Sequence, residues 1–174
     1  MITGALVDLR PFTAEDVDHL ERVANDAAYH GPFATFVLSG AGDMRRRFEV
    51  DGYLTHEHGR LVVVDKSGAL VGRVSYRAVS HGPPPSSLAY NIGVIIDPAF
   101  RQRGYGADAQ SLLARYLFET YTVERVEAST DVENTGEQRA LERAGFTREG
   151  ILRHAQWRAG AWHDLVLYSK LRGE

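Results

Sequence analysis

The sequence contains no cysteine among its 174 residues. This absence excludes disulfide scaffolds, thiolate zinc sites, iron–sulfur clusters and cysteine nucleophiles. It is also compatible with a reducing compartment, and we expect a cytoplasmic protein. The first ten residues lack the basic head and long apolar stretch of a secretory signal, so none is predicted.

Long hydrophobic runs are absent as well. The longest, such as residues 61–64 and 94–96, have the length of strands and fall far short of the ~20 residues that a membrane helix needs. The charge is nearly balanced, with 20 basic and 23 acidic residues and a net charge of −3. Nucleic-acid binding needs a basic surface, and the arginine run at residues 45–47 is interpreted as a solvated helix face. We therefore expect neither a membrane nor a nucleic-acid partner.

The sequence does contain enough apolar material for one core. With 44% hydrophobic residues in 174, it predicts a single domain over residues 1–174 that needs no covalent support. The clearest loop is at residues 81–87, where three consecutive prolines exclude a helix or a central strand. This loop is too short to link two domains.

The hydrophobic pattern alternates between the period of strands and that of helices. Strands are predicted at residues 6–10, 60–65, 70–79, 88–97, 123–130, 146–152 and 163–171. Helices are predicted after a capping box of Thr13 and Asp16, after an N-cap at Asp43, over 105–121, and over 136–144 before a C-terminal Gly145. A strand–helix–strand unit predicts one parallel pair, and the hairpins predict antiparallel pairs. The fold class is therefore α/β, with one mixed sheet and helices packed on its faces.

One loop carries most of the chemical information. After a buried strand, the chain enters a helix through Gly104 and Gly106, with Arg101 and Arg103 just before them. Free backbone N–H groups at a helix start attract anions, and glycines let a phosphate approach the backbone. We therefore predict a phosphate or pyrophosphate site at this glycine loop, residues 101–106.

A dinucleotide-binding interpretation competes for the same loop. Gly104, Gly106 and Ala109 match the pattern GxGxxG/A, and Glu124 stands about twenty residues further on. That motif, however, places its glycines directly after the strand, whereas residues 98–103 intervene here. Preferential binding of NAD would support this interpretation.

The glycine loop, with the sequence RQRGYG, resembles the R/Q-x-x-G-x-G/A signature of the GNAT acyltransferase superfamily. Asn134 matches an asparagine that follows the next strand in many members, and residues 140–150 resemble the "leKlGF…eG" segment. The start and end of the chain resemble the RimJ/RimL-like branch, so the resemblance covers nearly the whole sequence. These further matches are Leu9, Arg10, Pro11, Glu15, Asp16, Arg153, Gly160, Trp162, Asp164 and Tyr168.

The resemblance implies a GNAT-like fold. Its central sheet is mostly antiparallel, helices cover both faces, and two parallel strands, residues 88–97 and 123–130, splay apart. Acetyl-CoA (coenzyme A) would lie between them as co-substrate, with no metal, and its pantetheine would pair with the strand backbone much as a peptide adds to a sheet edge. The implied cofactor-binding residues are Val94, Ile95, Ile96, Arg101, Gln102, Arg103, Gly104, Tyr105, Gly106, Ala107 and Asn134.

The implied activity is that of an acyl-CoA-dependent N-acyltransferase. It would move an acetyl group to a primary amine by direct attack in a ternary complex, with a backbone N–H near Val94 stabilising the oxyanion. The acceptor is either a protein N-terminus or a small-molecule amine, and relatives are commonly homodimers. The alternative is a non-catalytic acyl-CoA-binding module of the same fold.

Three positions depart from the family pattern. Asn91 stands where a carboxylate is usual, Glu137 where a serine is usual, and Leu141 where other members have a tyrosine. Glu137 is either a catalytic group near the sulfur or the fourth residue of a capping box begun by Asn134. We name Glu137 and Asn91 as candidate catalytic residues. The other residues expected near the reacting atoms are Tyr90, Ser129 and Asp131.

Several ring side chains have both a functional and a structural interpretation. His56 and His58 could bind a metal together, but no third ligand is evident and an exposed loop is predicted. His154 and His163, at the two ends of the last hairpin, either face each other across the strands and line the acceptor side or are ordinary strand residues. Five aromatic residues form an acceptor pocket or belong to the core: Tyr29, Phe33, Phe36, Trp157 and Trp162.

Overall fold

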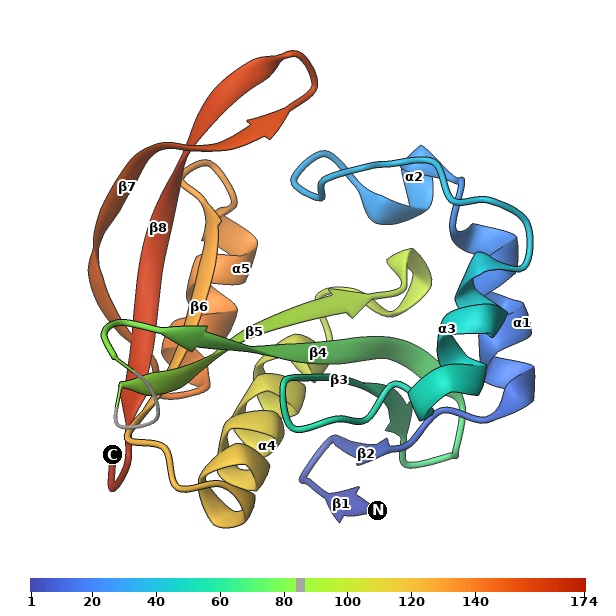
Figure 1. Ribbon diagram of the computed structural model, residues 1–174, viewed down its shortest axis with the longest axis horizontal. Coiled ribbons are helices and arrows are strands. Elements are labelled where there is room, and N and C mark those ends of the chain that lie inside the picture. Colours follow the sequence, from blue (N-terminus) through green and yellow to red (C-terminus); the bar gives the residue numbers. More distant parts are fainter. Residues whose placement is uncertain (84–86) are drawn as a thin grey trace.

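Across residues 1–83 and 87–174, which the computed structural model describes, eight strands form one sheet in the spatial order β1-β2-β3-β4-β5-β6-β8-β7 (Figure 1). The strands are β1 (Ile2–Thr3), β2 (Val7–Arg10), β3 (His58–Asp65), β4 (Leu70–Ser80), β5 (Leu88–Ile96), β6 (Arg125–Asp131), β7 (Thr147–Arg158) and β8 (Ala161–Leu171). All neighbours pair antiparallel except β5 and β6, which are parallel. The predicted mixed sheet with one parallel pair is confirmed. Part of the predicted proline loop, residues 84–86, lies outside the described residues.

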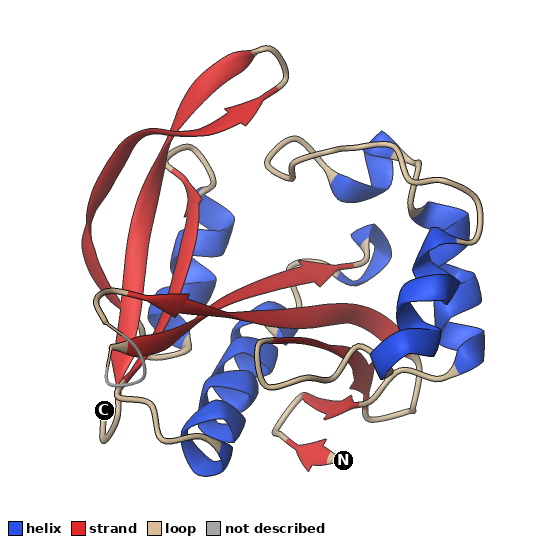
Figure 2. Cartoon of the chain, in the orientation of Figure 1, coloured by secondary structure: helices blue, strands red, loops and turns tan. Residues whose placement is uncertain are grey.

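Helices pack on both faces of this sheet (Figure 2). They are α1 (Ala14–Val23), α2 (Ala27–His30), α3 (Asp43–Asp51), α4 (Tyr105–Thr120) and α5 (Thr135–Arg143), with a single 3-10 turn η1 (Pro98–Phe100) before α4. Side chains alternate between the two faces of a strand, and β3 divides its apolar residues accordingly. Leu61 and Val63 join the core under α4, whereas Val62 and Val64 pack with α1 and α3. No helix in the described part of the chain is long and apolar enough to cross a membrane.

The helix ends follow the predicted local chemistry with one exception. Thr13 caps α1, and the side chain of Asp16 accepts the Thr13 N–H at 2.7 Å, so the predicted capping box is confirmed. The prediction that Asp43 caps α3 is wrong, because Gly42 is the N-cap, at φ +71°, and Asp43 is the first helical residue. The Asp43 carboxylate instead pairs with Arg47 one turn later, at 2.9 Å.

The strands β7 and β8 form a hairpin arm that extends beyond the rest of the sheet (Figure 1). The strands predicted from the sequence, residues 146–152 and 163–171, are shorter than those of the structure, which continue to Arg158 and begin again at Ala161. In the structure Arg158 is buried and donates to Asp131 at the end of β6, at 2.5 Å. Burial alone would raise the pKa of Asp131, but hydrogen bonds from Arg158 and from backbone lower it below its usual value. This buried ion pair holds the arm against β6.

The arm also decides between the two interpretations of its histidines. His154 occupies an irregularity in the β7–β8 register at φ +48°, and its N–H donates to Asp164 at 2.7 Å. His163 pairs across the hairpin with Gln156 and contacts Arg158. The interpretation that His154 and His163 face each other is therefore wrong, because the bulge shifts the register between them.

Candidate active site

The feature that organises the site is an open strand edge. β5 pairs with β4 along its whole length, but it pairs with β6 at only two positions, Tyr90–Val126 and Asn91–Glu127. Beyond these the two strands diverge (Figure 1), so within the described chain residues 92–96 have no strand partner on that side. This open edge holds the predicted pantetheine-binding residues Val94, Ile95 and Ile96. Unpaired strand N–H and C=O groups are ready to bind an extended, amide-containing chain.

The glycine loop leads from this edge into α4. Gln102 and Gly104 have φ values of +64° and +82°, and Gly104 is the N-cap of the helix. The helix start has no side-chain cap, so the backbone N–H groups of Tyr105, Gly106 and Ala107 are available to a ligand. Successive N–H groups in a left-handed turn and at a helix start attract anions.

The first turn of α4 is open next to Gly106. A Cβ added to Gly106 would meet only Ile96 Cγ1, at 3.7 Å, so protein atoms leave the first turn of α4 uncovered. One turn further along, Gln110 is fully buried, its Nε2 donates to the Gly106 carbonyl at 3.1 Å, and its Oε1 has no partner in the described structure. The uncapped helix start therefore suits a ligand with an anionic group.

The arginines of the glycine loop also donate hydrogen bonds to backbone carbonyl groups. Arg101 donates to the carbonyl oxygens of Ile96 and Tyr29, both at 3.0 Å. Arg103 donates to the Ala99 carbonyl at 3.2 Å. Both side chains are exposed, so their charge stays at the rim of the site while their hydrogen bonds hold the loop backbone in place.

Asn134 and Glu137 meet at the start of α5, beside the same opening. The Asn134 side chain accepts the Glu137 N–H at 3.3 Å and donates to Thr130 Oγ1 at 3.0 Å. The N–H of Asn134 itself donates to the Asp131 carbonyl at 3.0 Å. The capping-box interpretation of Glu137 is therefore wrong: Asn134 caps the helix, but the Glu137 carboxyl does not reach back to it.

The Glu137 carboxyl is instead packed toward α4. Burial raises its pKa from 4.5 to about 7, and a hydrogen bond with Gln110 opposes that rise only in part. A carboxyl group with a pKa near neutrality can either hold or release a proton at the working pH. Glu137 is thus the group on the α4 side of the opening that is suited to proton transfer.

The opposite face of the sheet holds a second polar group, which the sequence reading did not include. Glu127, in register with Asn91, is 7% exposed, lies 2.8 Å from His81 Nε2 and accepts from Arg125 Nε at 3.0 Å. Two hydrogen bonds from Arg125 lower the pKa of Glu149 to about 2, so that carboxylate is the main partner of Arg125. The alternation of side chains along β6 places Glu127 on the same face of the sheet as Asn91, and this alternation could have identified Glu127 from the sequence.

Other predicted site residues have structural roles. Tyr90 is fully buried and donates to the His56 carbonyl at 2.8 Å, and Leu141 is fully buried in the core. Ser129 is exposed on β6. His58 begins β3 rather than lying in a loop and contacts Asp51 at 3.3 Å, and the described residues contain no cluster of three metal-ligating side chains.

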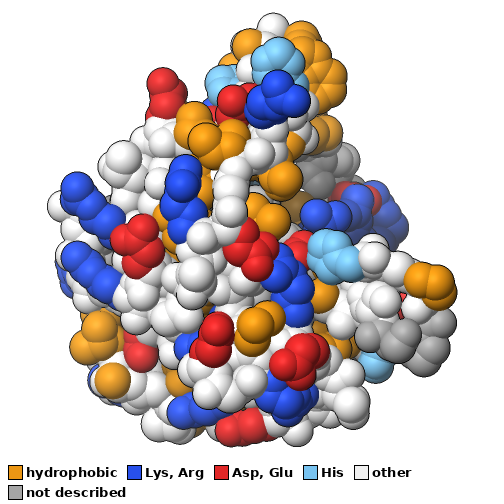
Figure 3. Space-filling view, turned by 90° about the vertical axis from the view of Figure 1, so that its left-hand side faces the viewer, with side chains coloured by type: hydrophobic (Ala, Val, Ile, Leu, Met, Phe, Trp, Pro, Cys, Tyr) orange, Lys and Arg blue, Asp and Glu red, His pale blue; other side chains and the backbone are white. Residues whose placement is uncertain are grey.

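The five predicted pocket aromatics fall into two groups. Tyr29 is buried and donates to Asp97, whereas Phe36 packs near the ring of His30. Trp157 and Trp162 form an exposed pair with ring centroids 5.4 Å apart, in the hydrophobic area near the tip of the arm (Figure 3). Phe33 connects the groups by lying 5.8 Å from the guanidinium of Arg158. The five residues therefore come from two segments, the α2 region with the loop after it and the arm.

Comparison with known proteins identifies a family and a fold for this chain. The family model described as an acetyltransferase (GNAT) domain matches residues 7–147. The relative named "Probable N-acetyltransferase YjcK" of Bacillus subtilis is 27% identical, over 94% of this chain and 93% of that protein. Two solved structures have the same fold: RimL, a ribosomal L7/L12 α-N-protein acetyltransferase in complex with coenzyme A, and spermidine N-acetyltransferase from Vibrio cholerae in complex with CoA and spermine. RimL has a TM-score of 0.78 and 18% identity, and the match covers 98% of this chain and 96% of RimL. The spermidine N-acetyltransferase has a TM-score of 0.77 and 17% identity, and the match covers 95% of both chains.

Proposed function

This chain belongs to the GNAT acetyltransferase family, an acyl-CoA-dependent class of enzyme, and we propose that it transfers an acetyl group from acetyl-CoA to a primary amine. The observation that carries this proposal is the open edge of β5 beside the uncapped glycine start of α4. The structural neighbours solved with CoA support acetyl-CoA as the co-substrate. Their own acceptors, a ribosomal protein N-terminus and a polyamine, leave both a protein and a small molecule as candidates here.

In this proposal the chain binds the donor through backbone groups. The pantetheine amides pair with the open edge at Val94, Ile95 and Ile96, and the pyrophosphate binds the N–H groups of residues 105–107. Asn134, at the head of α5, closes the other side. Acetyl-CoA supplies an activated thioester, so a large part of the rate enhancement comes from holding amine and thioester in contact.

The reaction requires one oxyanion donor and one acid. The amine nitrogen bonds to the thioester carbon, a backbone N–H near Val94 stabilises the oxyanion, and the carbon–sulfur bond then breaks. Glu137, with its pKa raised to about 7 by burial, donates its proton to the departing thiolate. A non-catalytic module would have no use for a carboxyl group held near neutrality, so this residue favours the enzyme.

The amine proton leaves on the other face of the sheet, toward His81. Glu127 accepts from His81 at 2.8 Å and lies in register with Asn91, two residues before Gly93 on the open strand. Glu127 thus positions the imidazole, and the half-exposed His81 takes up the proton and passes it to water. Asn91 has no titratable group and serves as a hydrogen-bonding neighbour.

Changing His81 to glutamine is expected to lower kcat/KM at least about tenfold. Loss of an enclosed general base lowers the rate more, by about 10²- to 10⁴-fold, but water reaches His81 and can replace it in part. Glu127→Gln should give a similar loss, and the double variant should be no worse than either single one, since both act on one proton. Steady-state kinetics of the three variants test this. Additive losses would contradict the pairing of the two residues.

The proposed function is tested first by calorimetric titration with acetyl-CoA, using NAD as the control. We expect acetyl-CoA to bind and NAD not to bind. Release of free CoA thiol is then followed with a panel of primary amines. Preferential NAD binding would overturn the donor assignment, and acetyl-CoA binding without turnover of any amine would favour the non-catalytic module.

A further inference from the structure

The face of the sheet that lies opposite α4 carries arginines that lack acidic partners. Arg60 on β3 and Arg73 and Arg77 on β4 all project on this side, since they occupy alternate positions of paired strands. Among the described residues, no ion pair includes any of the three. Uncompensated positive charge on one face of a cleft favours anions and repels polycations.

Arg60 is the most enclosed of these arginines. Its guanidinium lies 5.0 Å from the centroid of the Tyr53 ring, and its Nη1 is 3.9 Å from Met44 Sδ. Burial lowers its pKa from the usual value. Tyr53 and Asp51 oppose that shift, whereas the charges of Arg73 and Arg47 add to it. A half-buried guanidinium in contact with a ring and a thioether has donors to spare for a bound anion.

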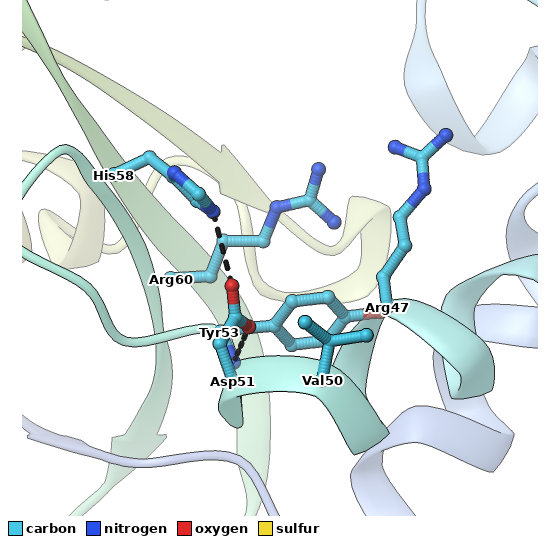
Figure 4. Close-up of a pocket in the computed structure, with 6 residues that line it drawn as sticks. All are labelled: Arg47, Val50, Asp51, Tyr53, His58 and Arg60. Carbon is cyan, nitrogen blue, oxygen red and sulfur yellow. Dashed lines mark hydrogen bonds and ion pairs between the residues drawn. The ribbon is translucent and has the colours of Figure 1, made fainter.

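Arg60 lines a pocket of about 210 Å³ between β3 and α3 (Figure 4). Arg47 extends from α3 to the same side as Arg60, as Figure 4 shows. The one carboxylate of the lining, Asp51, is already engaged at both oxygens. Its Oδ1 accepts the Tyr53 N–H at 2.8 Å, and its Oδ2 lies 3.3 Å from His58 Nε2. Among the described residues Asp51 makes no ion pair with Arg60 and acts on it only as a nearby charge, so the guanidinium keeps hydrogen-bond donors for a ligand.

This pocket is aligned with the open strand. Arg60 pairs with Ser75, and Ser75 pairs with Gly93, so the three residues form one row across β3, β4 and β5. Two strand spacings place the Cα atoms of Arg60 and Gly93 about 10 Å apart, with all side chains on the same face. Gly93 leaves its own position open, since an added Cβ would meet only Ser75 Oγ, at 3.3 Å. The row thus places Arg60 on the same face of the sheet as Gly93 and within the length of a small acceptor.

We propose that the acceptor is a small primary amine that also carries an anionic group, a carboxylate or a phosphate, and that Arg60 binds this group. The inference rests on the proposed function and names its substrate class. Arg47, already paired with Asp43 at 2.9 Å, adds positive potential at the mouth of the pocket. The same arrangement disfavours spermidine and other polycationic acceptors.

The test compares acceptors of matched length that differ in charge: 4-aminobutyrate with butylamine, and aminoethyl phosphate with ethylamine. We expect the anionic member of at least one pair to have a kcat/KM about 10- to 100-fold higher, as for a hydrogen bond to a charged group. The better pair distinguishes carboxylate from phosphate. Arg60→Gln should remove the preference by raising KM for the anionic amine alone, and Arg60→Lys should restore part of it.

Arg46→Gln is the matched control, because Arg46 is an exposed arginine of α3 that contacts Asp43 and the Ala41 carbonyl. It should leave the preference unchanged. Equal rates for charged and neutral amines, or a preference for spermidine, would overturn the inference and leave the proposed function intact. A preference for a peptide with an acidic N-terminal residue over every small amine would also overturn it.

Calorimetry separates the two proposals when no amine is acetylated. If acetyl-CoA does not bind to the unaltered protein, the proposed function is refuted. If acetyl-CoA binds, 4-aminobutyrate and aminoethyl phosphate are titrated into the CoA-loaded protein. Binding of either one that Arg60→Gln abolishes supports the anion pocket, and absence of binding rejects it. Arg60→Gln should leave the affinity for acetyl-CoA unchanged, which also shows that the variant is folded.

Discussion

Replacing Gly104 by aspartate is expected to lower the affinity for acetyl-CoA about 100-fold or more, since like charges in contact cost several kcal/mol. Gly104 caps α4 at φ +82° and leads the backbone N–H groups toward the ligand. An aspartate there would add a negative charge to the loop at which we propose that the pyrophosphate binds. Calorimetric titration of the variant with acetyl-CoA measures the effect.

Gly104→Ala separates the charge from the geometry. A Cβ at this position comes 3.1 Å from Leu6 Cδ1, and its positive φ strains any residue other than glycine. Both variants carry that cost, so both should lose some thermal stability, but only the aspartate adds a repelling charge. If the two variants bind acetyl-CoA equally well, and as tightly as the unaltered protein, the glycine loop is not the pyrophosphate site.

Glu137→Gln is expected to lower kcat about 100-fold, the lower range for loss of a general acid. The amide keeps the shape and the hydrogen bond to Gln110 but has no proton to give. In the unaltered protein, kcat/KM should fall as the pH rises through about 7, because the acid loses its proton there. The variant should lack that descending limb. Rate profiles from pH 5 to 9 provide the measurement.

The same substitution should stabilise the fold at high pH. The folded-state pKa of Glu137 is raised above its usual value of 4.5, so the protein loses stability as the pH rises from about 4.5 to beyond 7. Glutamine does not ionise. The variant should therefore gain roughly 1–3 kcal/mol in free energy of unfolding at pH 8 and nothing at pH 4. The lower end of that range applies if solvent partly screens the Glu137 charge.

Glu133→Gln is the control, since Glu133 is an exposed glutamate in the turn before α5. It should change neither the rate profile nor the pH dependence of stability. A Glu137→Gln variant with unaltered turnover and an unaltered rate profile would leave Glu137 without a catalytic role, even if the gain in stability at pH 8 were found.

Local features of the fold were predictable because neighbouring residues decide them. Thr13 and Asp16 satisfy each other's groups within one turn, and the alternation of β3 follows from strand geometry alone. The Asp43 cap failed because a glycine with φ +71° also starts a helix, and a sequence pattern does not reveal backbone dihedrals. The arm was underestimated because Arg158 has its partner 27 residues away.

The candidate site divides in the same way. By itself the sequence determined the glycine loop, the strand that leads into it and the asparagine that caps the next helix, since each needs only contiguous residues of the right type. Only the tertiary structure decided which side chains meet: His81 with Glu127 across 46 positions, the half-buried Glu137 with Gln110 of α4, and Arg60 with Tyr53 in a shared pocket. Burial and pairing arise when distant segments pack together, and they control protonation and charge. The proposed donor site could thus be predicted from motifs, whereas the proposed proton path and the proposed preference for an anionic acceptor depend on the folded arrangement.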